Sequence, residues 1–174
     1  HPDRAGWASR LLAIPGGVRT AGAGGAGLCL RRGLGVLADR AVAPGFAAAL
    51  RTRVRGTVRE HEGLARYSTY RIGGPATVLL PEVAADVGAA LAFAAAEGVP
   101  WFALGLGSNL LLPDEGMTAL VIRLGKGLDS LEALGAGRFR IGAGLPQPIA
   151  ARRTSEAGWR GLHRFVGVPG SVGG

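Results

Sequence analysis

Cysteine and histidine are scarce in this sequence of 174 residues, and each scarcity excludes a kind of site. The single cysteine, Cys29, cannot form an intramolecular disulfide, and one thiol leaves no cysteine-rich zinc site. The three histidines, His1, His61 and His163, stand apart and lack the His-Glu-x-x-His spacing of zinc proteases, so no metal site is expected. No local pattern combines an acid, a base and a nucleophile, so no catalytic residue is assigned.

Uncharged stretches long enough to span a membrane and a clustered basic surface are also missing. Residues 20–30 form an uncharged, glycine-rich stretch of 11 residues, whereas a membrane-spanning helix needs about 20 mostly apolar residues. The net charge is +8, but ten Arg against three acidic residues place +7 of it in residues 1–60. The remaining 114 residues therefore carry only +1 and lack the basic face that binds a phosphate backbone. Neither a membrane nor a nucleic acid is expected as a partner.

Glycine is abundant, with 31 residues, and its distribution divides the chain in two. Residues 1–43 mix Arg with glycine-rich runs and show no sustained period of 2 or 3.6 residues. We interpret them as a low-complexity extension that is expected to be disordered. The sequence does not begin with Met, which suggests a fragment or a processed product. Residues 44–174 are expected to form the folded domain.

The patterning of the folded domain predicts an α+β fold. Phe46, Leu50 and Val54 share one face of a short helix that should end near Gly56. A strand, a helix and a strand in succession over residues 76–104 predict two parallel strands joined by a right-handed crossover. A small parallel part is thus followed by an antiparallel hairpin. The predicted strands are residues 57–60, 69–72, 76–80, 101–104, 120–124, 130–134 and 138–141, and the longer helices are residues 83–97 and 149–157.

Three glycine-rich segments are candidates for binding a ligand, and the first two follow predicted strands. Residues 105–109 combine two glycines with Ser108 and Asn109, and glycines allow successive backbone N–H groups to face one anion. The segment is not a Rossmann fingerprint, because Leu110 stands where the third glycine would be, and a tight turn without a ligand is the alternative. Residues 142–144 and 167–174 are the other two segments, and a flexible tail is the alternative for the last. Convergence of all three would indicate a large cofactor rather than one phosphate.

Four segments in order resemble the UDP-N-acetylenolpyruvoylglucosamine reductase (UDP-N-acetylmuramate dehydrogenase) family, namely residues 64–76, 105–111, 142–144 and 161–174. The resemblance covers about residues 45–174. It implies the FAD-binding fold of the vanillyl-alcohol oxidase group, with a small parallel βαβ subdomain followed by an incomplete antiparallel subdomain. It also implies a cytoplasmic, monomeric flavoprotein oxidoreductase of peptidoglycan precursor synthesis, and hence of cell wall biogenesis, cell shape and cell division. Such an enzyme uses NADPH to convert UDP-N-acetylglucosamine enolpyruvate to UDP-N-acetylmuramate.

The resemblance also implies which residues hold FAD. Residues 105–110 would hold its pyrophosphate through backbone amides, and residues 168–174 would pass along the flavin, with residues 142–144 nearby. The family's catalytic Arg, Ser and Glu follow its last Gly-Gly pair, so this fragment is expected to be inactive. The alternative is a non-catalytic FAD- or nucleotide-binding module. The expected cofactor-binding residues are Gly105, Leu106, Gly107, Ser108, Asn109, Leu110, Gly142, Gly144, Val168, Pro169, Gly170, Ser171, Gly173 and Gly174.

Overall fold

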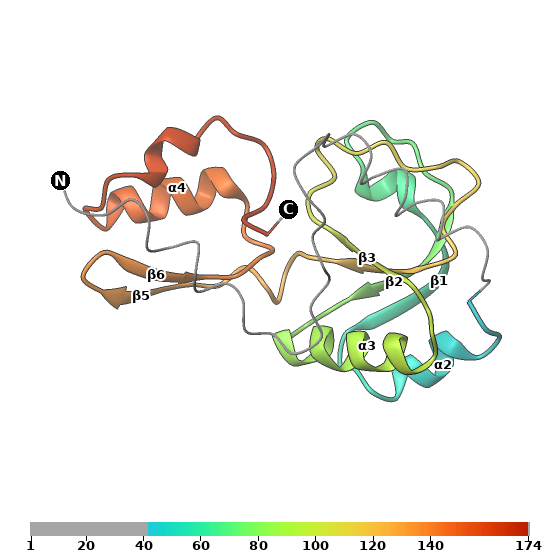
Figure 1. Cartoon of the computed structure of the whole chain (residues 1–174). Coiled ribbons are helices and arrows are strands. Elements are labelled where there is room, and N and C mark those ends of the chain that lie inside the picture. The colour runs from blue at the N-terminus through green and yellow to red at the C-terminus, as the bar shows by residue number, and fades with distance from the viewer. Residues whose placement is uncertain (1–41, 174) are drawn as a thin grey trace, which may run out of the picture.

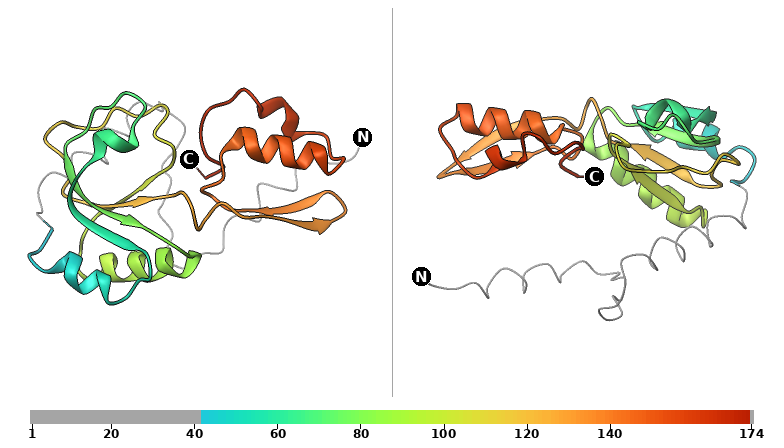
Figure 2. Two further views of the ribbon diagram at one scale, coloured as in Figure 1. Left: turned by 180° about the vertical axis from the view of Figure 1, so that it is seen from behind. Right: turned by 90° about the horizontal axis from the view of Figure 1, so that it is seen from above.

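The computed structural model describes residues 42–173, so nearly all of the predicted extension lies outside the described residues. The described residues form two lobes that lie side by side, and the C-terminal end of the chain returns between them (Figures 1 and 2). The first lobe contains α2 (Phe46–Arg51), β1 (Thr57–Gly63), η2 (Leu64–Tyr67), β2 (Pro75–Leu80), α3 (Ala84–Ala96), β3 (Trp101–Leu104) and β4 (Leu120–Arg123). The second lobe contains β5 (Leu131–Gly135), β6 (Arg138–Ile141), α4 (Gln147–Glu156) and η3 (Leu162–Phe165).

The sheet of the first lobe is mixed, with the strand order β1-β2-β4-β3. Strand β4 pairs in parallel with both β2 and β3, whereas β1 is antiparallel to β2. The predicted α+β class and the parallel relation of β2 and β3 are therefore confirmed. The sequence did not predict that β4 inserts between these two strands, or that an antiparallel strand completes the same sheet. Since β2, β3 and β4 are parallel, their carboxyl ends lie at one edge of the sheet.

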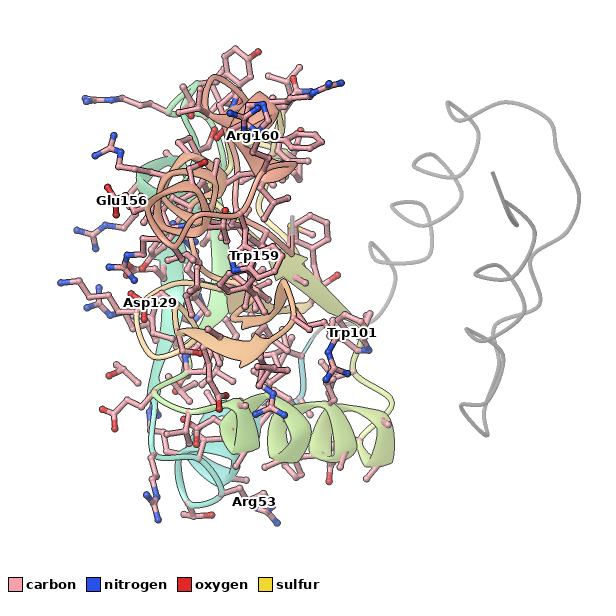
Figure 3. The ribbon with its side chains drawn as sticks, turned by 90° about the vertical axis from the view of Figure 1, so that its left-hand side faces the viewer. Arg53, Trp101, Asp129, Glu156, Trp159 and Arg160 are labelled. Carbon is pink, nitrogen blue, oxygen red and sulfur yellow. The ribbon has the colours of Figure 1, made fainter. Side chains whose placement is uncertain are left out.

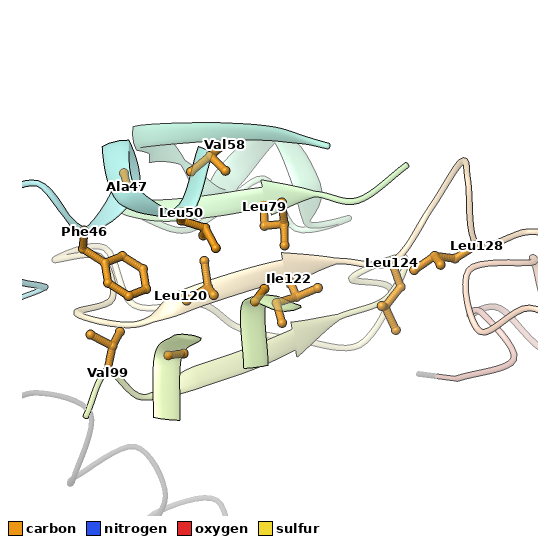
Figure 4. Close-up of a cluster of buried hydrophobic side chains, with 12 residues drawn as sticks. Phe46, Ala47, Leu50, Val58, Leu79, Val99, Leu120, Ile122, Leu124 and Leu128 are labelled. Atoms are coloured by element: carbon orange, nitrogen blue, oxygen red, sulfur yellow. The ribbon is translucent and has the colours of Figure 1, made fainter. Parts of the chain in front are cut away.

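Alternation along β4 divides the core of the first lobe between the two faces of the sheet. Leu120 and Ile122 belong to a cluster with Leu50 of α2, and the small residues Ala90 and Ala94 of α3 contribute to the same cluster (Figure 4). Val121 points to the opposite face, where the buried residues include Leu64, Leu104 and Leu112. The first three residues of β4 therefore form a continuous apolar run, because both faces of the strand are covered.

The connection from α2 to β1 is held by one buried carboxylate. Asp86, in the first turn of α3, is 3% exposed. Its Oδ1 accepts a hydrogen bond from the backbone N–H of Arg55 at 2.8 Å, and its Oδ2 accepts from Gly56, Glu82 and Val83 at 3.1, 2.8 and 3.2 Å. Burial by itself raises the pKa of Asp86, but these four backbone donors outweigh it and hold the pKa below its usual value.

Two local predictions were wrong. Residues 69–72 form no strand, because the Ser68 hydroxyl accepts the backbone N–H of Tyr70 at 3.2 Å and Arg71 has a φ of 54°, in the left-handed region. Helix α2 ends at Arg51 rather than near Gly56. The remaining predicted elements are found within a few residues of their expected bounds.

The second lobe is built on the predicted antiparallel hairpin of β5 and β6. Its turn uses positive φ at Gly135, Ala136 and Gly137. Trp159, which follows α4, lies over this turn (Figure 3), and a Cβ atom at Gly137 would come within 2.7 Å of the Trp159 ring. The segment that follows α4 therefore packs against the tip of the hairpin through Trp159.

Candidate cofactor site

The glycine loop, which we define as residues 105–110, leaves β3 at the carboxyl edge of the parallel strands. Within the described part of the chain, no hydrogen bond uses the backbone N–H groups of residues 105–109 or the side chains of Ser108 and Asn109. Gly105 and Gly107 are nevertheless buried, and backbone N–H groups in such positions normally have a partner. Five consecutive free donors at the end of a parallel strand make a site that fits an anion.

A turn formed by residues 67–70 holds the glycine loop in place. The N–H of Thr69 donates to the Gly107 carbonyl at 3.1 Å, and the Ser68 hydroxyl donates to the Leu110 carbonyl at 3.5 Å. Gly107 has a φ of +65°, and a Cβ atom there would lie 2.2 Å from the Tyr67 carbonyl oxygen. Position 107 thus needs glycine because of a neighbouring segment of the protein. The sequence interpretation had attributed this glycine to the approach of a phosphate.

The other two glycine-rich segments lie against each other. The N–H groups of Val172 and Gly173 donate to the carbonyls of Leu145 and Ala143, both at 2.9 Å. The N–H of Gln147 donates to the Gly170 carbonyl at 2.9 Å, which completes an antiparallel pairing of residues 170–173 with residues 143–147. This pairing brings the C-terminal end of the described chain into the region between the lobes (Figure 2).

The end of β4 joins these two segments to the glycine loop. The N–H of Leu124 donates to the carbonyl of Leu104, the last residue before the loop, at 2.8 Å. A Cβ atom at Gly144 would lie 2.5 Å from the Gly125 carbonyl oxygen, so the two backbones are in contact there. The three segments therefore converge through residues 124 and 125.

Three of the expected site residues are not part of this convergence. Val168 and Pro169 are exposed in the second lobe, and Gly174 lies outside the described residues.

The hydroxyl of Ser171 is buried in this region without a hydrogen-bond partner among the described residues. The residue is 1% exposed, and among residues 42–173 its hydroxyl has no hydrogen-bond partner. A buried hydroxyl without a partner costs free energy that an ordinary core position would not carry. Together with the free N–H groups of the glycine loop, this orphaned hydroxyl fits a polar cofactor bound between the segments.

A charged cluster around Glu62 holds Tyr67, the first residue of the turn that contacts the glycine loop. One oxygen of Glu62 accepts hydrogen bonds from Arg66 at 2.7 Å, the Tyr67 hydroxyl at 2.8 Å and Arg59 at 3.0 Å. Burial alone raises the pKa of Glu62, but these three donors outweigh it and lower the pKa. Burial, and then the hydrogen bond to Glu62, raises the pKa of the Tyr67 hydroxyl. The role of Tyr67 and Ser68 was missed because their contacts to the loop span about 40 residues.

Within residues 42–173, no three His, Cys, Asp or Glu side chains gather closely enough to hold a metal ion. None of the described helices is long and apolar enough to cross a membrane.

Comparisons with known proteins agree on one group of relatives. The family model described as "FAD binding domain" matches residues 75–174. UDP-N-acetylenolpyruvoylglucosamine reductase of Caulobacter sp. (strain K31) is 46% identical over 122 residues, which cover 70% of this chain and 39% of that protein. A Bacillus cereus reductase of the same name is 42% identical over 120 residues, covering 68% of this chain and 40% of that protein.

A solved structure gives the same result. The crystal structure of UDP-N-acetylenolpyruvylglucosamine reductase from Thermus caldophilus is similar with a TM-score of 0.56 and 33% sequence identity, over 68% of this chain and 41% of that one. The resemblance found in the sequence motifs is thereby confirmed. The chain spans about two fifths of the length of the curated relatives that it matches.

Proposed function

This chain belongs to the FAD binding domain family, and we propose that it is the FAD-holding part of a UDP-N-acetylenolpyruvoylglucosamine reductase. The observation that carries the proposal is the run of free backbone N–H groups in residues 105–109 at the carboxyl edge of the parallel strands. The relatives at 42–46% identity supply the reaction class, since each bears the name of this reductase.

The chain's own residues would bind and orient the cofactor. Residues 105–110 would hold the FAD pyrophosphate through their N–H groups, which point to no other acceptor in the described chain. Residues 168–174 would lie along the flavin, where the buried hydroxyl of Ser171 would find its missing partner. Residues 142–144 would support this second segment through the pairing of Ala143 with Gly173.

The chemistry that bound FAD would supply is hydride transfer, from NADPH to one carbon of the enolpyruvyl double bond of the UDP-sugar, and the other carbon would take a proton. The product would be UDP-N-acetylmuramate, a precursor of peptidoglycan. We propose that the enzyme works in the cytoplasm as a monomer, and that its catalytic residues lie outside the 174 residues of this chain. The alternative, a non-catalytic FAD-binding module, would have the same FAD-binding segments but would not catalyse the reaction.

Titration of the 174-residue chain with FAD, followed by the change in flavin fluorescence, tests the proposal. We expect saturable binding of one FAD per chain. Adding NADPH and the enolpyruvyl substrate to the loaded chain should give no turnover. Absence of FAD binding would contradict the assigned cofactor role, and turnover would contradict the placement of the catalytic residues outside this chain.

A further inference from the structure

Arg123 is a charged residue at the point where the segments of the candidate site meet. It is the last residue of β4 and lies in register with Leu104, the residue before the glycine loop. Alternation along β4 places its side chain on the face of Val121. There its guanidinium carbon lies 6.0 Å from the centre of the Tyr67 ring, close to the limit for a cation–π contact. The carbonyl of Tyr67 in turn contacts Gly107 of the loop.

The guanidinium also lies near the backbone that joins the two halves of the site. Its Nη1 donates to the Leu124 carbonyl, and a Cβ atom at Gly125 would lie 4.0 Å from the same nitrogen. Leu124 is hydrogen-bonded to Leu104, the residue before the glycine loop, and the Gly125 carbonyl contacts Gly144. Arg123 is therefore next to the residues that connect the glycine loop to residues 142–144.

Within residues 42–173, no acidic side chain forms an ion pair with Arg123. Among the described residues the ion pairs join Arg51 to Glu60, Arg59 and Arg66 to Glu62, and Arg140 to Glu132, so Arg123 takes part in none of them. Its Nη1 donates to the Leu124 carbonyl, which leaves most of its N–H donors without a protein acceptor. Burial lowers the pKa of Arg123, yet an arginine remains charged at neutral pH. A partly buried cation without an anion is costly unless a ligand supplies one.

We propose that Arg123 binds the diphosphate of the cofactor as the counter-charge to the N–H groups of residues 105–109. A guanidinium presents paired donors that match two phosphate oxygens, and it forms stronger hydrogen bonds to an anion than neutral donors do. The hydrogen bond from Nη1 to the Leu124 carbonyl anchors one end of the group, and the Tyr67 ring lies 6.0 Å from its central carbon. This inference rests on the proposed FAD site and adds to it a residue that the glycine-rich motifs did not indicate.

Three probes separate a diphosphate contact from a structural role of Arg123. FAD carries the flavin, the diphosphate and adenosine, ADP-ribose carries the diphosphate and adenosine without the flavin, and riboflavin carries the flavin without the diphosphate. For Arg123→Gln in the full 174-residue chain, we expect the affinity for FAD and ADP-ribose to fall roughly 10- to 100-fold, as for the loss of a charged hydrogen bond. Riboflavin binding should stay unchanged. Arg123→Lys should recover part of the loss, because the charge remains.

Arg138→Gln is the matched control, because it removes the same charge from an exposed position at the start of β6. It should change the affinity for FAD by less than about twofold, as expected for a distant surface charge. Equal losses for FAD and riboflavin, or no loss for FAD, would overturn the role of Arg123 while leaving the FAD site itself in place. If the unmodified chain binds neither FAD nor ADP-ribose, the proposed function fails and this inference fails with it.

Discussion

Asp86 is a residue whose four backbone hydrogen bonds join the start of α3 to the turn before β1. Asp86→Ala leaves those N–H groups without their partner, so we expect the free energy of unfolding at pH 7 to fall by about 3 kcal/mol. Urea denaturation measures the change. Asp129→Ala, at an exposed position, is the control and should leave stability within about 0.5 kcal/mol of the unmodified chain.

The contribution of Asp86 should depend on pH with a defined sign. Its pKa is lowered in the folded state, so the unfolded chain binds the proton more readily. The stabilisation is therefore complete above the unfolded pKa of about 4 and is lost as the pH falls through the folded value. The difference between the unmodified chain and Asp86→Ala should shrink from pH 7 to pH 3. A constant difference over that range would contradict the assigned role of the carboxylate.

Ser171 allows the effect of a ligand to be separated from the effect of folding. Its buried hydroxyl has no partner in the described chain, so Ser171→Ala should raise the free energy of unfolding of the ligand-free chain by about 1 kcal/mol. If the hydroxyl contacts FAD, the same change should weaken FAD binding about fivefold. Ser155→Ala, on the exposed side of α4, should change neither quantity. Lower stability of Ser171→Ala would show that the hydroxyl has a protein partner.

At the scale of the elements, two glycines with opposite surroundings test how the glycine loop is held. Gly88 lies in α3, and a Cβ atom there meets nothing within 4 Å, so Gly88→Ala should stabilise the helix by about 1 kcal/mol. At Gly107 a Cβ atom meets the Tyr67 carbonyl and φ is positive, so Gly107→Ala should destabilise the chain by about 3 kcal/mol. Denaturation midpoints measure both changes. A neutral Gly107→Ala would contradict the contact with the turn of residues 67–70.

Local patterns were sufficient to predict most elements and the position of the glycine loop. The apolar residues of β2, α3 and β3 follow their own periods, and the loop follows directly from the end of a strand. Residues 69–72 were mispredicted because Thr69 and Ile72 favour a strand, whereas the Ser68 hydroxyl and the positive φ of Arg71 form a turn.

Contacts between distant segments were not predictable in the same way. The pairing of β4 with β2, and the contact of Ser68 with Leu110, each join residues about 40 positions apart. The sequence identified the glycines of the site but attributed them to the ligand. In the structure, neighbouring protein atoms leave no room for a Cβ atom at Gly107, Gly144 or Gly173. Within the described residues, the N–H groups of residues 105–109 have no protein acceptor, so these groups are the ones available to a ligand.

At the scale of the whole molecule, we propose one binding site between the two lobes. The first lobe would contribute the glycine loop and Arg123 at the carboxyl edge of its sheet, and the second would contribute the paired segments of residues 143–147 and 170–173. Because the contributions come from both lobes, binding should affect residues that lie about 65 positions apart in the sequence.

Amide chemical shifts of the isotope-labelled 174-residue chain during titration with FAD test this claim most directly. We predict that the amide signals of residues 105–109 and 170–173 move together with one saturation curve, since one cofactor contacts both segments. The exposed amides around Asp114, at a turn outside the site, should not move. Shifts confined to one lobe, or absent from residues 105–109, would contradict the assignment of the cofactor site.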